Sequence, residues 1–105
     1  MKTIKELAKN IVEALEDKKA EDIHIIDIQE VSSIADYFII ASGNNRSQIQ
    51  ALADHVEEVL GKEGLALKQV EGYDAANWVL MDYQDIIIHL FDRENRLFYD
   101  LDRIW

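Results

Sequence analysis

Few residues in this sequence have the types and spacing that catalysis requires, and those few point to chemistry on phosphates. Ser42-Gly43 separates a β-branched run from a helical pattern. A strand, a glycine turn and a helix start together form an anion-binding site. Asp100-Leu101-Asp102 is the only Asp-x-Asp sequence in the chain and has the form of a Mg²⁺-binding pair.

Nucleotide transfer would need more than these two features. It requires a Gly-Ser turn that holds the phosphates, and two or three carboxylates that converge on the metal. Here Ser42-Gly43 has the reverse order, the Asp pair stands in the C-terminal tail, and only Arg46 supplies a cation near the turn. We therefore expect no catalysis. A small-ligand sensor at Gly43 is an alternative for which no residue gives positive support.

The side chains that bind metals are equally sparse. The chain has no cysteine, so it has no disulfide framework and no thiolate nucleophile or metal site. Its three histidines, His24, His55 and His89, are not spaced as metal ligands. We expect no cofactor and no metal. His89 stands in an apolar run and has the pattern of a core histidine or of a neighbour to a contact surface.

Charge indicates the kind of partner. The 105 residues, enough for one domain spanning residues 1–105, carry 11 basic and 21 acidic side chains, a formal net charge of −10. Residues 1–19 hold five Lys against four acidic residues, so residues 20–105 hold six basic and 17 acidic residues, a net of −11. A domain with this negative charge should bind nucleic acid only weakly and should favour a basic protein as its partner.

No stretch has the pattern of a targeting signal or a membrane anchor. The N-terminal segment is amphipathic and rich in acids, unlike a secretory signal or a transit peptide. No apolar run approaches the roughly 18 residues of a membrane span. We expect a cytoplasmic protein that does not enter a membrane.

Two helices and three strands precede the last third of the chain. Apolar residues at helical spacing predict a helix over residues 4–15 with Thr3 as its N-cap, and a second helix capped by Asn45 and followed by Gly61. Residues 23–28 and 36–42 read as strands, and we expect the first to be central because both of its faces are mostly apolar. Residues 65–70 form a short apolar segment that we expect to be the third strand.

The last third predicts a hairpin. Residues 77–83 and 86–91 are rich in β-branched and aromatic residues, and Gln84-Asp85 separates them. A two-residue loop sets the pairs on one face, which is wholly apolar: Tyr83 with Ile86, Met81 with Ile88, and Val79 with Leu90. The other face pairs Trp78 with Phe91, Leu80 with His89, and Asp82 with Ile87.

These elements give a fold class and a contact surface. Five strands and two long helices predict an α/β (α+β) domain with a mixed five-stranded sheet, the helices mainly on one face, and a partly helical C-terminal tail. The second face should then be partly open. Its Trp78, Leu80, Ile87 and Phe91 make an apolar patch of the kind that marks a protein contact. A homodimer formed through the same face is an alternative.

The sequence also resembles a known family. Residues 72–105 are similar to the C-terminal signature of the ribosomal silencing factor S family, also called Iojap-like proteins. The matching residues are Glu71, directly before this stretch, and Gly72, Trp78, Asp82, His89, Arg96, Tyr99, Leu101 and Trp105 within it. Upstream matches are Ser32, Asp36, Ile39, Ile40, Ser42, Gly43, Ala53, Asp54 and His55. Two departures stand out: Gln84-Asp85 replaces the Gly-Asp hairpin turn usual in the family, and the sequence stops at Trp105, short of the longer tail that some members have.

The resemblance implies a function. Members of the family are non-catalytic translation factors that dock on ribosomal protein number fourteen of the large subunit and block joining of the small subunit by their bulk. Their fold is similar to a nucleotidyltransferase core, so a divergent metal-dependent nucleotidyltransferase is the alternative to test. The predicted partner-binding residues are Trp78, Leu80, Asp82, His89, Phe91, Tyr99, Leu101 and Trp105. The last three either seal the sheet edge or meet the partner.

Overall fold

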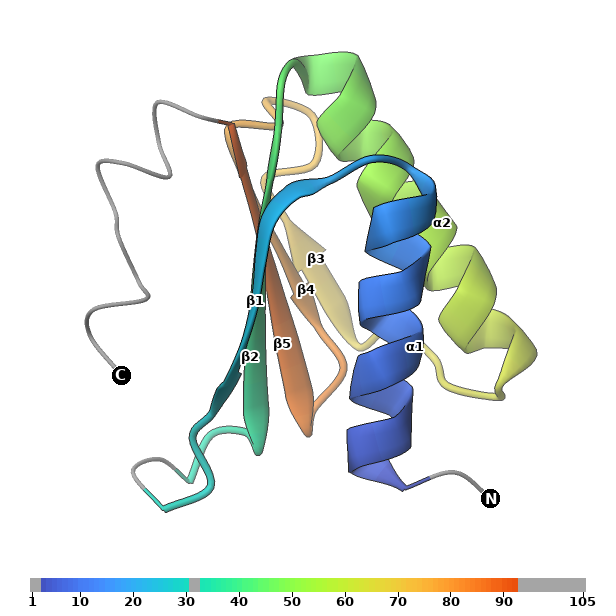
Figure 1. Cartoon of the computed structure of the whole chain (residues 1–105), viewed down its shortest axis with the longest axis vertical. Coiled ribbons are helices and arrows are strands. Elements are labelled where there is room, and N and C mark those ends of the chain that lie inside the picture. The colour runs from blue at the N-terminus through green and yellow to red at the C-terminus, as the bar shows by residue number, and fades with distance from the viewer. Residues whose placement is uncertain (1–2, 31–32, 93–105) are drawn as a thin grey trace.

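Two helices lie side by side on one face of a five-stranded sheet (Figure 1). The structure, a computed structural model, describes residues 3–30 and 33–92. Its elements are α1 (Ile4–Asp17), β1 (Glu21–Asp27), β2 (Tyr37–Gly43), α2 (Arg46–Lys62), β3 (Gln69–Glu71), β4 (Trp78–Asp82) and β5 (Ile86–Asp92). This arrangement confirms the predicted fold class, while the tail predicted to be partly helical lies outside the described residues.

The sheet has the strand order β1-β2-β5-β4-β3. Strands β2 and β5 are parallel, and the other three pairs are antiparallel. The parallel pair sets Phe38 beside Ile87 and Ile40 beside His89. The β4–β5 hairpin has the predicted register, with Trp78 opposite Phe91 and Leu80 opposite His89. The hairpin's two faces are therefore the ones that the sequence predicted.

The prediction that the first strand is central was wrong, because β1 is an edge strand. Its pairing with β2 shifts register between Glu21 and His24. Ile23 packs toward the helices and Ile26 packs against the opposite face, while Ile25 stays 44% exposed. An edge strand that contributes to both faces has the same apolar pattern as a central one, so the pattern alone misplaced it.

Both helices begin at their predicted N-cap residues, but α2 does not end where the sequence predicts. The Thr3 hydroxyl accepts the Glu6 N–H, and the Asn45 side chain accepts the Gln48 N–H. Gly61 was predicted to follow α2, yet the helix runs to Lys62 and it is Gly64 that has a positive φ, +81°.

The true end of α2 is a Schellman motif. Leu65 N–H donates to Leu60 C=O, and Gly64 N–H donates to Gly61 C=O.

The third strand is shorter than predicted, because only Gln69–Glu71 pairs as β3. Leu65 and Leu67 instead lie in the irregular connection between α2 and β3 and pack against the core.

The main core lies between the sheet and the helices. It joins Leu15 of α1 and Leu52 of α2 to the helix-facing side of the hairpin, including Met81 and Leu90. A smaller cluster of Ile28, Ala35, Phe38 and Ile87 covers part of the opposite face, with Leu80 packed against it. Among the described residues, no helix is long and apolar enough to cross a membrane.

Candidate partner-binding face

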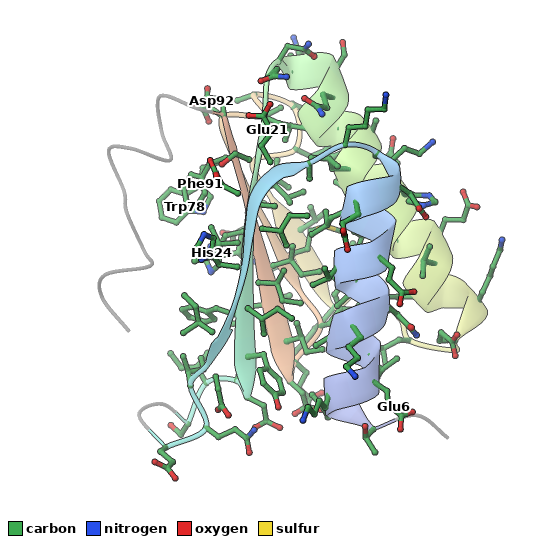
Figure 2. The ribbon with its side chains drawn as sticks, in the orientation of Figure 1. Glu6, Glu21, His24, Trp78, Phe91 and Asp92 are labelled. Carbon is green, nitrogen blue, oxygen red and sulfur yellow. The ribbon has the colours of Figure 1, made fainter. Side chains whose placement is uncertain are left out.

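An aromatic cluster occupies the sheet face that points away from the helices. Trp78 of β4 stacks on Phe91 of β5, with ring centroids 5.1 Å apart and planes at 28° (Figure 2). The Trp78 indole N–H donates to Nδ1 of His89 at 3.1 Å. Phe38 of β2 meets the His89 ring edge-on at 4.9 Å. Trp78 is thus held by two residues of β5, and Phe38 of β2 packs in turn on one of them, His89.

The hydrogen bond from Trp78 determines the tautomer of His89. An indole nitrogen can only donate, so Nδ1 must accept and the neutral imidazole carries its proton on Nε2. Burial lowers the pKa of His89 to about 4, and the ring is therefore neutral at neutral pH. Its Nε2 is buried and has no hydrogen-bond partner among the described residues. His89 is a core histidine that supports Trp78.

Exposure differs across this face. The Phe91 ring is 0% exposed and His89 is 5% exposed, whereas Trp78 and Leu80 are half-buried. The expectation of a partly open face therefore fits β4 better than β5. Strand β5 is the middle strand of the five and is paired along its length with β2 and β4, whereas β4 is flanked on its outer side only by the three-residue edge strand β3, so the residues of β5 are the more deeply buried ones.

The other predicted partner-binding residues have different positions. Asp82, half-buried at the end of β4, accepts the Gln84 N–H at 2.7 Å and thereby closes the hairpin turn. Tyr99, Leu101 and Trp105 lie outside the described residues.

Phe38 is the member of the cluster that the sequence pattern does not reveal. Alternation along β2 puts Phe38, Ile40 and Ser42 on one face, but it does not say which face of the sheet that is. Only the parallel pairing with β5 sets Phe38 beside the hairpin. A sign that the chain crosses over from β2 through α2 before it returns in β5, parallel to β2, would have placed Phe38 beside the hairpin.

The turn after β2, the candidate phosphate site, is filled by its own chain. A Cβ on Gly43 would lie 2.8 Å from the Ile49 side chain, so the first turn of α2 packs directly on the glycine. The Gln48 side chain accepts the Asn44 N–H at 2.6 Å, and Asn45 accepts the Gln48 N–H at 2.8 Å. These backbone donors, which a phosphate would need, are already bound.

No metal centre emerges in the described part of the chain. Across residues 3–30 and 33–92, no three His, Asp or Glu side chains gather as potential ligands. Asp100 and Asp102, the pair with the form of a metal motif, lie outside these residues.

Comparison with known proteins identifies relatives along the whole chain. A family model described as "Ribosomal silencing factor during starvation" matches residues 1–105. The protein named Ribosomal silencing factor RsfS from Halalkalibacterium halodurans is 39% identical over 100 residues, which cover 95% of this chain and 86% of that protein. The mouse protein named Mitochondrial assembly of ribosomal large subunit protein 1 is 29% identical over 98 residues, 90% of this chain and 43% of that protein.

A solved structure has the same fold. The crystal structure of a Chromobacterium violaceum protein superposes with a TM-score of 0.96 at 34% identity, covering 99% of this chain and 87% of that one.

Proposed function

The chain belongs to the ribosomal silencing factor family, and we propose that it represses translation by docking on the large ribosomal subunit. In this proposal it binds ribosomal protein number fourteen and occupies the surface at which the small subunit would join. The family name supports a ribosome-associated silencing role, and the name of the mouse relative supports association with the large subunit.

The observation that carries the proposal is the fixed, half-buried ring of Trp78. Stacking on Phe91 and the hydrogen bond to His89 hold the indole before any partner arrives. A preordered aromatic ring loses little conformational entropy on binding, and Trp is among the residues that most often dominate protein interfaces. Leu80, half-buried beside it on β4, extends the same surface.

Charge supports a protein contact rather than an RNA contact. A net charge of −10 repels a phosphate backbone and attracts a basic ribosomal protein. We therefore propose little direct binding to nucleic acid. The bacterial relatives lead us to expect that the protein acts in the cytoplasm.

The proposed mechanism is steric and involves no catalysis. The family name describes a regulator, and the Gly43 turn is filled by α2 rather than open to a phosphate. A homodimer through the same face would compete with the ribosome for Trp78, so dimer formation and docking would exclude each other.

Truncation of Trp78 tests the proposal. We expect Trp78→Ala to weaken binding to purified large subunits by about 2 kcal/mol or more, as loss of an interface anchor does. Trp78→Phe keeps a ring against Phe91 but loses the donor to His89, so its loss should be smaller. The measurement is an equilibrium titration of labelled protein with large subunits.

Val70→Ala is the matched control, because Val70 is an apolar side chain of the edge strand β3 that is 41% exposed. It should bind like the parent. The proposal is wrong about this face if Trp78→Ala stays folded and binds as tightly as the Val70→Ala control.

A further inference from the structure

The loop between β3 and β4 sits directly against the backbone of Trp78. Gly72 has φ +78°, and a Cβ at this position would come within 2.2 Å of the Trp78 carbonyl oxygen. Any other residue at position 72 therefore meets both an unfavourable backbone conformation and a backbone atom that cannot rotate away. The Ala76 N–H donates to the Gly72 C=O at 2.9 Å and closes the loop.

Helix α2 holds this loop from the other side. The Tyr73 hydroxyl donates to the Asp54 carboxylate at 2.9 Å, and this bond is the main reason that the pKa of Tyr73 is raised. The Gln50 side-chain amide donates to the Tyr73 carbonyl at 2.9 Å. The Tyr73 side chain also packs on the main core. Figure 1 shows the loop, in pale orange, beside the first turns of α2.

The far end of the loop is fixed as well. The Asp92 N–H donates to the Asn77 C=O at 3.2 Å, which ties the residue before Trp78 to the end of β5. The loop is thus hydrogen-bonded to α2 at Tyr73 and to β5 at Asn77, and it closely approaches the Trp78 backbone at Gly72. Its contacts pass from the helix face to the residue that presents the indole on the opposite face.

We propose that Gly72 and Tyr73 are positioning residues for Trp78, and that α2 fixes the partner-binding ring through Asp54 and Gln50. The inference rests on the proposed function of Trp78 as the partner anchor. The chain's contact with the ribosome is then determined partly by residues that lie on the helix side and touch no partner. Displacement of the ring would weaken both its stacking on Phe91 and its hydrogen bond to His89, and a binding surface needs its contact groups held within about 0.5 Å.

The first test uses the two glycines with positive φ. Gly72 and Gly64 have φ +78° and +81°, but a Cβ at Gly64 meets nothing within 4 Å. Gly72→Ala and Gly64→Ala therefore impose the same backbone strain, and only Gly72→Ala pushes on Trp78. We expect Gly72→Ala to weaken binding to large subunits by at least about tenfold, and Gly64→Ala to leave it unchanged.

A spectroscopic signature separates positioning from loss of the fold. The indole N–H resonance of Trp78 in a ¹H–¹⁵N spectrum, identified by its absence in Trp78→Phe, reports the bond to His89 without any ribosome. It should move in Gly72→Ala and stay in place in Gly64→Ala. An unmoved resonance in Gly72→Ala, or an equal movement in both variants, would overturn the proposal.

A milder pair of variants covers the case in which Gly72→Ala does not fold. Tyr73→Phe removes only the hydroxyl bonded to Asp54, and it should move the indole resonance and weaken binding about fivefold, as expected for one hydrogen bond. Asp54→Asn keeps an acceptor oxygen and should behave like the parent. The proposal fails if Tyr73→Phe leaves the resonance unmoved.

The two proposals fail in distinguishable ways. A parent protein that does not bind large subunits contradicts the proposed function. The indole resonance in Gly72→Ala and Tyr73→Phe still supports or overturns the positioning of Trp78 in that case, because it is measured on the free protein.

Discussion

At the scale of a single residue, the burial of His89 makes the unfolding free energy of the protein depend on pH. Desolvation lowers its pKa to about 4 in the folded chain, against 6.5 in the unfolded chain. Between these values the unfolded state binds the proton and the folded state does not, so stability falls as the pH drops from 6.5 to 4. The full contribution is present above pH 6.5.

A comparison with His89→Phe isolates this effect. Between pH 7 and pH 4 the parent should lose about 3 kcal/mol more of its unfolding free energy than His89→Phe does. Urea unfolding at each pH measures both proteins, and the difference between the two profiles reports the contribution of His89. Parallel pH profiles would mean that His89 is solvated rather than buried.

At the scale of elements, the hairpin could be predicted from the sequence and the edges of the sheet could not. Period-two alternation and a two-residue loop leave one register for β4 and β5, which the structure confirms. The place of β1 and the side occupied by Phe38 depend instead on pairing with strands distant in the sequence. Local patterns carry no information about such pairing.

For the candidate site too, one part could be predicted from the sequence and another part could not. Trp78, His89 and Phe91 could be grouped from the sequence because they share one hairpin. The donor from Trp78 to His89 and the loop that presses on Trp78 depend on side-chain and backbone geometry. Helical spacing predicts Gly61 and not Gly64 as the residue after the helix, because it does not show that the Leu65 N–H returns to bond the Leu60 C=O.

The hairpin turn contains strain that one substitution should remove. Gln84, the first loop residue, has φ +75°, a conformation that favours glycine at this position of a two-residue loop. Gln84→Gly should stabilise the protein by about 0.5–1 kcal/mol in urea or thermal unfolding. Asp85→Gly, the neighbouring residue without a positive φ, should destabilise it. A lower stability for Gln84→Gly would show that the turn is not strained.

At the scale of the whole molecule, charge should act on the speed of docking. A net charge of −10 attracts a basic partner over a distance that salt shortens, whereas the aromatic contact is apolar. Raising the ionic strength through the physiological range should slow association with large subunits and change dissociation much less. Stopped-flow measurements at several salt concentrations give both rates. A constant association rate would remove electrostatic attraction from the proposal.

The central claim is that the protein silences ribosomes by occupying one surface of the large subunit. Sedimentation of purified large and small subunits with increasing amounts of the protein tests it most directly. The proposal predicts that subunits stay separate once about one copy per large subunit is present, without nucleotide, and that excess small subunit reverses the effect. Trp78→Ala with His89→Ala should abolish separation, and Asp100→Asn with Asp102→Asn should leave it intact. Separation by far less than one copy per subunit, or its loss with the Asp pair alone, would contradict steric blocking.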